Sequence, residues 1–357
     1  MLPLLSRALL LILSVWLFDA TSIAIAQSAT AGSSGTKLTP TPLGPSKPAT
    51  FSSKSFEYWL SGSPEDSKPD KTRGGLFLSG GGGQVSDAWR WFIECAGGGD
   101  IVVLNALGTD FYQDFVFENL GNVDSVETIR FNEASAANDP KVLDILSRAD
   151  GIFMSGGKQT RYIAWWKDSP IEAAINAHVL AGKPLGGSSA GLAIISHYYY
   201  GSMEGSVRTE IALGDPFDKR IDIGKDFIAA PLLAGVLTDS HFSNRQRLGR
   251  LLAFLGRTMV DEKPERLVGL GIDEGTALCV ESDGMAKLFT EKNGFAWLVE
   301  ATQPPSVIEP GKPLEMHHVK VTQISSDSRL NLVQRSVTKP LSVQFVSAME
   351  GRLEIDP

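Results

Sequence analysis

The sequence predicts a doubly wound α/β domain with a mostly parallel sheet and antiparallel strands at its C-terminal end. From residue 74 onward, short apolar runs alternate with amphipathic stretches of helical length. Strands that are apolar on both faces and separated by helices form a parallel sheet that is covered on both sides. After Glu274 the runs alternate with turn residues instead, which is typical of antiparallel strands.

The pattern places each element by residue range. Strands are expected at 74–79, 100–106, 125–131, 149–155 and 183–189. Helices are expected between them at 86–96, 109–120, 139–147 and 170–181. The closing antiparallel strands are expected within 277–290 and 319–335. Because ligands of such sheets bind at the carboxyl ends of the strands, the loops after Ser79, Ser155 and Gly187 are where chemistry is expected.

Composition excludes several classes of protein. The 357 residues are 43% hydrophobic, which is enough for a full core, and they carry a net charge of −8. An acidic chain without a basic run is not expected to bind nucleic acid. Cys95 and Cys279 cannot form a disulfide framework and neither belongs to a C-x-x-C pair, so buried thiols are favoured over one long-range disulfide.

The N-terminus has the pattern of an export signal. Arg7 precedes an apolar run at 8–18, and Ala24-Ile25-Ala26 supplies a small-x-small cleavage site. The run is too short to span a bilayer, so we expect no membrane attachment after cleavage at residue 26 and a periplasmic or extracellular location. Residues 27–72 are rich in Ser, Thr, Pro, Lys and Gly, which indicates a linker with a short ordered piece around 56–60, followed by one domain at 73–357.

Four consecutive glycines, at 80–83, follow the first expected strand. They match a dinucleotide-binding turn only weakly, since Val85 stands where a small residue is needed and no acidic residue follows a second strand at the right distance. We therefore interpret them as a tight turn that lets the backbone approach the mouth of the active site.

Gly187-Ser188-Ser189-Ala190-Gly191 matches the G-x-S-x-G nucleophile elbow between an expected strand and a helix. The glycines allow a sharp turn that exposes the central serine hydroxyl, and the Ala190 N–H is then directed at the oxygen of a bound carbonyl.

A serine hydroxyl needs a base, usually a histidine oriented by a carboxylate. Of the five histidines, only His241 follows an apolar run that reads as a strand leading to the site. The acid could precede it in the segment that contains Asp215, Asp218, Asp222 and Asp226, or it could follow at Asp273 and Glu274. The spacing leaves both alternatives open.

Five segments of the chain together resemble the cyanophycinase and dipeptidase E family of serine peptidases. They are the elbow, Asp239-Ser240-His241-Phe242, the arginine series Arg245, Arg247 and Arg250, Gly271-Ile272-Asp273-Glu274, and the loop Gly156-Gly157-Lys158-Gln159. The resemblance extends from about residue 74 to 335. It implies a flavodoxin-like fold similar to class I glutamine amidotransferases, and a cofactor- and metal-free triad of Ser189, His241 and Glu274. It also implies an oxyanion hole formed by the N–H groups of Gly157 and Ala190.

The family attacks peptide bonds made by or next to aspartate, and cyanophycinases release β-aspartyl-arginine dipeptides. The resemblance therefore implies substrate contacts by Gln159, Asp239, Arg245, Arg247 and Arg250. On a helix Arg247 and Arg250 share a face that Arg245 does not, so at least one arginine is expected to be a structural ion-pair partner.

Three positions depart from the cyanophycinase pattern: Ser188 replaces Thr, Lys158 replaces Asn and Ser240 replaces Gln. The loop at 105–110 also differs. These changes affect the expected substrate pocket and leave the triad intact. The alternatives are an esterase of the α/β-hydrolase type that uses an acid before His241, and a non-catalytic protein that binds aspartyl peptides. Family members often form dimers, so a homodimer is an expectation.

Overall fold

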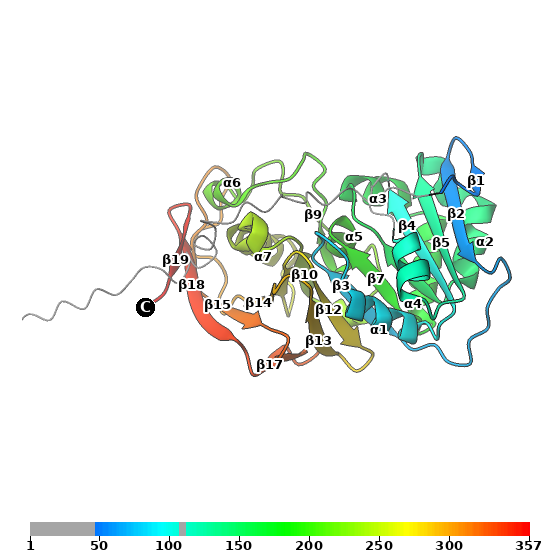
Figure 1. The fold of residues 1–357 in the computed structure, drawn as a ribbon. Helices are drawn as coiled ribbons and strands as arrows, with labels where there is room; N and C mark the ends of the chain where they lie inside the picture. The colour runs from blue at the N-terminus through cyan, green and yellow to red at the C-terminus, as the bar shows by residue number, and fades with distance from the viewer. Residues whose placement is uncertain (1–46, 107–111) are drawn as a thin grey trace, which may run out of the picture. The chain divides into compact units, whose positions relative to one another are not determined.

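The computed structural model describes residues 47–106 and 112–357, and its strands form two sheets. The first sheet has the strand order β1-β2-β5-β4-β6-β7-β3-β12-β13-β16-β17 and the second has the order β19-β18-β15-β14-β11-β10-β8-β9 (Figure 1). The expected α/β architecture with a parallel sheet and closing antiparallel strands is confirmed. Its division into two sheets was not predicted.

The centre of the first sheet is parallel. Its strands are β5 (Ser125–Phe131), β4 (Asp100–Ala106), β6 (Gly151–Met154), β7 (Leu185–Ser188) and β3 (Gly75–Ser79). They are buried on both faces, as the continuous apolar runs predict. The antiparallel strands on either side are β1 (Phe51–Ser52), β2 (Phe56–Gly62), β12 (Thr276–Glu281), β13 (Met285–Thr290), β16 (Arg329–Asn331) and β17 (Ser336–Thr338).

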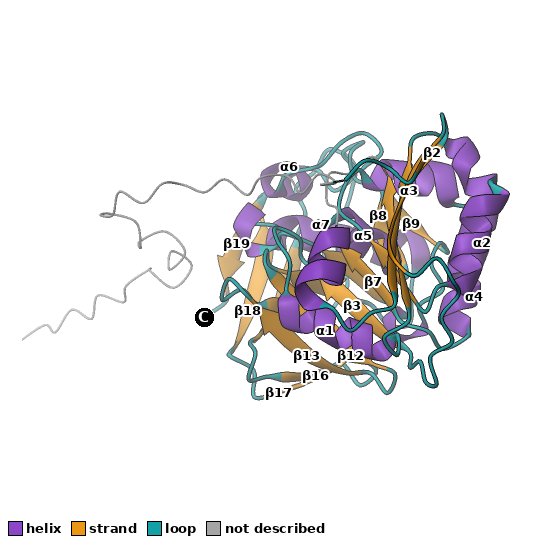
Figure 2. Cartoon of the chain, turned by 45° about the vertical axis from the view of Figure 1, so that its right-hand side comes forward, coloured by secondary structure: helices purple, strands orange, loops and turns teal. Residues whose placement is uncertain are grey.

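Alternate residues of the parallel strands pack against helices on opposite faces of the sheet. Phe77, Val103 and Phe153 pack with α1 (Ser86–Cys95), whereas Leu78 and Leu104 belong to the larger core on the other face. The helices of that face are α2 (Pro140–Arg148), α3 (Gln159–Trp166), α4 (Pro170–Leu180) and α5 (Ala190–Ile195). Figure 2 shows α1 on one side of these strands and α2 and α4 on the other.

The second sheet has a short parallel centre with antiparallel strands on both sides. Its members are β8 (Tyr198–Tyr200), β9 (Ile223–Lys225), β10 (Val236–Asp239), β11 (Val268–Ile272), β14 (Ala296–Glu300), β15 (Met316–Ile324), β18 (Ser342–Met349) and β19 (Arg352–Ile355). Strand β10 pairs in parallel with β8 and with β11. The helices α6 (Thr209–Gly214) and α7 (Leu248–Glu262) supply part of its core.

The chain passes from the second sheet to the first at the turn between β11 and β12, which contains Glu274. Ser189 follows β7 of the first sheet, whereas His241 follows β10 of the second. The expected catalytic residues therefore meet where strand ends of both sheets come together.

Several local features differ from expectation. The ordered domain begins before residue 73, because β2 is a seven-residue strand that pairs along its whole length with β5. The ordered piece expected at 56–60 is thus an integral strand of the sheet. Phe115–Leu120 is a π-helix, and residues 109–111 of the helix expected there lie outside the described part. Short 3₁₀ turns occur at Ala134–Asn138, Pro231–Leu233 and Ser243–Arg245.

Cys95 and Cys279 are both free thiols, and burial raises the pKa of each, that of Cys95 to about 12. This agrees with the favoured interpretation and not with a disulfide. The expected leader lies outside the described residues. Within 47–106 and 112–357, no helix is long and apolar enough to cross a bilayer.

Candidate active site

Ser189 occupies a strained turn between β7 and α5. Its φ of 53° and ψ of −107° are unfavourable for a residue with a side chain, at a cost of about 1–3 kcal/mol. A Cβ at Gly191 would lie 2.1 Å from the Met154 carbonyl oxygen, and one at Gly187 would lie 2.7 Å from the Gly191 carbonyl carbon. The two glycines of the motif are therefore required by close backbone packing, as the elbow interpretation predicts.

One hydrogen-bonded chain connects Ser189, His241 and Glu274. Ser189 Oγ lies 2.7 Å from His241 Nε2, and His241 Nδ1 lies 2.6 Å from Glu274 Oε1. Because an ionised carboxylate only accepts hydrogen bonds, the ring proton belongs on Nδ1 and Nε2 is free to accept from the serine hydroxyl. This is the geometry of a nucleophile, a general base and an orienting acid.

His241 is held in its neutral form. Burial, together with the positive charge of Arg245, lowers the pKa of His241 to about 4, although the hydrogen bond that His241 donates to Glu274 acts in the opposite direction. An imidazole with this pKa is unprotonated at neutral pH, so its Nε2 is available as a proton acceptor.

The acids that precede His241 are engaged elsewhere. Asp218 accepts two hydrogen bonds of 2.7 Å from the Arg220 side chain, which hold the pKa of Asp218 at about 2. Asp215 accepts from the Phe217 and Gly311 backbones, and Asp222 from that of Met203. Asp226 lies 4.0 Å from His197. The geometry thus favours Glu274, the alternative that follows the histidine.

Asp239, Arg247 and Arg250 form a buried ion cluster. Asp239 accepts 2.5 and 2.7 Å hydrogen bonds from Arg250 and a 3.2 Å bond from Arg247, and its side chain is only 4% exposed. Burial alone would raise the pKa of Asp239, but the two guanidinium groups outweigh this and lower it. The structure thus places these three residues in contact with one another away from solvent, and their contact with substrate stays an expectation.

Arg245 differs from the other two arginines of the series. Its side chain is 52% exposed, and its guanidinium lies 4.0 Å from Glu274 Oε1. It precedes α7 in a 3₁₀ turn, so it does not share the face of Arg247 and Arg250. Arg245 is thus the arginine placed near the triad with a cationic group open to solvent.

The predicted oxyanion and substrate residues lie at the starts of α5 and α3 and in the loop after β6. Ala190 is the first residue of α5, and Gly157 is exposed with a φ of 151° in the loop after β6. Gln159 begins α3 and donates a 2.5 Å hydrogen bond to the Tyr200 carbonyl, so its amide nitrogen is engaged within the protein. Lys158 beside it is exposed.

Sequence reasoning did not identify the residues that hold the Glu274 turn. Asn244 Oδ1 accepts a 3.0 Å hydrogen bond from the Glu274 N–H. The buried carboxylate of Asp273 accepts 2.9 Å bonds from the N–H groups of Ser243 and Phe295. Nothing in the spacing of these residues signals such roles, since the contacts join segments distant in the chain.

Two of the glycines at 80–83, Gly81 and Gly82, lie directly against the triad, which agrees with the tight-turn interpretation. A Cβ on Gly81 would lie 2.8 Å from His241 Nε2 and 3.0 Å from Ser189 Cβ. A Cβ on Gly82 would lie 2.6 Å from Glu274 Cβ. Residues without side chains are therefore needed here for the triad to have room.

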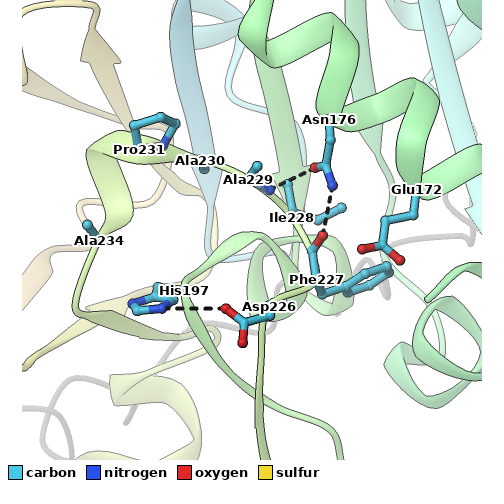
Figure 3. Close-up of a pocket in the computed structure, with 10 residues that line it drawn as sticks. All are labelled: Glu172, Asn176, His197, Asp226, Phe227, Ile228, Ala229, Ala230, Pro231 and Ala234. Atoms are coloured by element: carbon cyan, nitrogen blue, oxygen red, sulfur yellow. Dashed lines mark hydrogen bonds and ion pairs between the residues drawn. The ribbon is translucent and has the colours of Figure 1, made fainter. Parts of the chain in front are cut away.

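A separate cavity of about 430 Å³ lies near the other end of α5, where His197 follows the helix (Figure 3). Asn176 of α4 bonds the backbone of Phe227 and Ala229 at its wall. His197 and the exposed Asp226 face each other across one side of it. The cavity does not include any triad residue.

An α/β fold with a strained serine that is hydrogen-bonded to a histidine, which in turn is hydrogen-bonded to a glutamate, defines a serine-type hydrolase. Comparison with known proteins gives the family: residues 109–288 match the model of Peptidase family S51. The chain belongs to this family and is a serine-type peptidase of the cyanophycinase and peptidase E type, as the motif resemblance implied.

Several relatives are cyanophycinases. That of Trichormus variabilis is 30% identical over 227 residues, which cover 62% of this chain and 70% of the relative. That of Synechococcus elongatus is 30% identical over 258 residues, which cover 68% and 73%. A peptidase structure from an acI-B1 Actinobacterium aligns with 74% of this chain and 98% of its own, at 15% identity and a TM-score of 0.48.

Proposed function

We propose that this peptidase is exported and hydrolyses aspartyl or β-aspartyl peptide bonds, with cyanophycin as its substrate and β-aspartyl-arginine dipeptides as products. The observation that carries the hydrolytic part is the continuous hydrogen-bonded chain from Ser189 Oγ through His241 to Glu274 Oε1. The substrate part is supported by the cyanophycinase relatives.

The reaction follows from the positions of these atoms. Ser189 Oγ attacks the carbonyl carbon while its proton passes to His241 Nε2, and Glu274 stabilises the resulting imidazolium. The N–H groups of Gly157 and Ala190 donate to the oxyanion. The imidazolium then protonates the departing amine, which leaves an acyl-enzyme ester on Ser189.

Hydrolysis of the ester reverses the roles. His241, neutral again, removes a proton from water as the water attacks the acyl carbon, and then returns that proton to Ser189 Oγ as the acid product leaves. The proposed reaction needs no cofactor or metal. The lowered pKa of His241 keeps its ring unprotonated before each attack step.

The substrate part of the proposal uses Arg245 in place of the buried arginines. Its half-exposed guanidinium near Glu274 suits a substrate carboxylate, such as the free α-carboxylate beside a β-linked peptide. Asp239 is left out of the substrate site because Arg247 and Arg250 already bind it.

The test is clearing of insoluble cyanophycin by the purified protein, with products identified by mass. We expect release of β-aspartyl-arginine by the wild type, loss of release in Ser189→Ala and retention of it in Ser188→Ala, which removes the neighbouring hydroxyl. If cyanophycin is not cleared while an organophosphonate labels Ser189, the cyanophycin assignment is wrong but the hydrolytic assignment stands. If Ser189→Ala keeps full activity, the triad is wrong.

Export and self-association are tested separately. We propose cleavage after residue 26, and the mass of the protein recovered from outside the cytoplasm should then correspond to a chain that begins at Gln27. Recovery of the uncleaved chain from the cytoplasm alone would contradict export. The expected homodimer is tested by light scattering on the purified protein.

A further inference from the structure

The backbone of residues 79–82 contacts all three segments that carry the triad. The Ser189 N–H donates to the Ser79 carbonyl at 3.1 Å, and the His241 N–H donates to the Gly80 carbonyl at 2.9 Å. The N–H of Gly275, which follows Glu274, donates to the Gly81 carbonyl at 2.7 Å. Successive carbonyls of one short segment therefore fix the nucleophile, the base and the turn of the acid relative to one another.

Lys292 binds the next carbonyl of the same segment. Its Nζ donates to the Gly82 carbonyl at 2.6 Å, from the turn between β13 and β14. Its aliphatic stem crosses Gly275, where a Cβ would lie 2.7 Å from Lys292 Cγ and Cδ. The lysine thus contacts the glycine segment and the Glu274 turn at once, with its side chain on the surface.

We infer that Lys292 is a positioning residue of the hydrolytic reaction: it holds the glycine segment of residues 80–83 against His241 and Glu274. The inference rests on the proposed triad. Gly81, Gly82 and Gly83 all have positive φ values, so the segment lacks the regular hydrogen bonding of a helix or strand. A charge-assisted hydrogen bond to its exposed end fixes its position over the triad.

The geometry of the triad is sensitive to this position. The space for a Cβ at Gly81 is already taken by the His241 ring, and that at Gly82 by the Glu274 side chain. Release of the Gly82 carbonyl lets the segment move relative to both side chains, and hydrogen-bonded catalytic groups lose rate steeply when displaced by an ångström. Lys292 therefore affects turnover without contacting substrate.

The test compares Lys292→Met, which keeps the stem and removes the ammonium, with Lys292→Arg, which keeps a donor. Lys287→Met is the matched control, because Lys287 is an exposed lysine of β13 that lies over Phe289. We expect Lys292→Met to lower kcat about ten- to hundredfold with unchanged KM and melting temperature. Lys292→Arg should restore most of the rate, and Lys287→Met should behave as wild type.

The rate of Ser189 labelling by an organophosphonate gives the same comparison without any assumed substrate. Equal labelling of wild type and Lys292→Met would overturn the inference, whereas absence of Ser189 labelling in the wild type would overturn the triad itself. A variant of the segment itself gives a test that is independent of the lysine. Gly81→Ala, whose added Cβ would lie 2.8 Å from His241 Nε2, should abolish labelling, and retained labelling would overturn the inference that the position of the segment controls the triad.

Discussion

Two clusters of charged and polar side chains lie at the end of β10, and they have opposite character. Asp239, the last residue of the strand, is enclosed with two arginines and its charge is fully compensated. His241, two residues later, has a positive φ of 47° and bonds to a partly exposed glutamate and a strained serine. The same short motif thus supplies one cluster that holds the fold and one that is arranged for reaction.

The two clusters differ in what burial does to their charged groups. In the ion cluster the Asp239 carboxylate is enclosed by two guanidinium groups, and its hydrogen bonds are made within the protein. In the triad burial keeps His241 neutral while its Nε2 points to a serine hydroxyl. Changes in the first cluster should therefore act on stability, and changes in the second on rate.

The largest expected effect is on the triad. Glu274→Gln removes the carboxylate that fixes the His241 tautomer, and we expect kcat to fall about 10⁴-fold. The midpoint of urea unfolding should stay near the wild-type value, since the Glu274 side chain is partly exposed. Steady-state kinetics and denaturation of the same preparation measure both. A kcat within tenfold of wild type would show that another group orients His241.

The next effect is on the ion cluster. Asp239→Asn leaves two buried guanidinium groups without a counter-charge, which should lower the free energy of unfolding by about 3–5 kcal/mol. Urea denaturation followed by circular dichroism measures the loss. If stability is unchanged but KM rises sharply, Asp239 binds substrate after all and the contrast between the clusters is lost.

A smaller effect tests the electrostatic link between Arg245 and the triad. Because His241 accepts a proton only when neutral, the rate of Ser189 labelling should fall as pH drops through about 4. Arg245→Gln removes a charge that lowers the pKa of His241, so this acidic limb should move to higher pH. Arg208→Gln, an exposed arginine before α6, is the control for net charge. If wild type, Arg245→Gln and Arg208→Gln show the same dependence of the labelling rate on pH, Arg245 does not influence the pKa of His241.

The smallest effect is the control for the ion cluster. Asp261 of α7 pairs with Arg257, one turn earlier in the helix, at 2.8 Å, and the Asp261 side chain is 41% exposed. Asp261→Asn should cost only about 0.3–0.5 kcal/mol of unfolding free energy, because exposed pairs of this kind contribute little. A loss comparable to that of Asp239→Asn would mean that burial does not explain the difference between the two pairs.

Local pattern was sufficient for much of this molecule. The strands at 100–106 and 125–131 have the predicted bounds, and the first contains the run Ile-Val-Val-Leu that is typical of a parallel strand covered on both faces. The elbow at Ser189 could be predicted because its glycines are needed by contacts within the turn and with the adjacent strand. The strand pattern and the elbow motif both consist of residues that are neighbours in the chain, so both can be recognised in a single sequence.

The tertiary structure alone decided the rest. Asp239 and Arg245 both belong to motifs that carry the family resemblance. Only the packing of α7 against the second sheet buries Asp239 beside Arg250, and only the 3₁₀ turn leaves Arg245 near Glu274. The spacing left the orienting acid open and only the motif resemblance implied Glu274, whereas the meeting of two sheets brings Glu274 to His241. Contacts between segments far apart in the chain depend on how the sheets pack against each other. That packing cannot be predicted from the local residue pattern of any one segment.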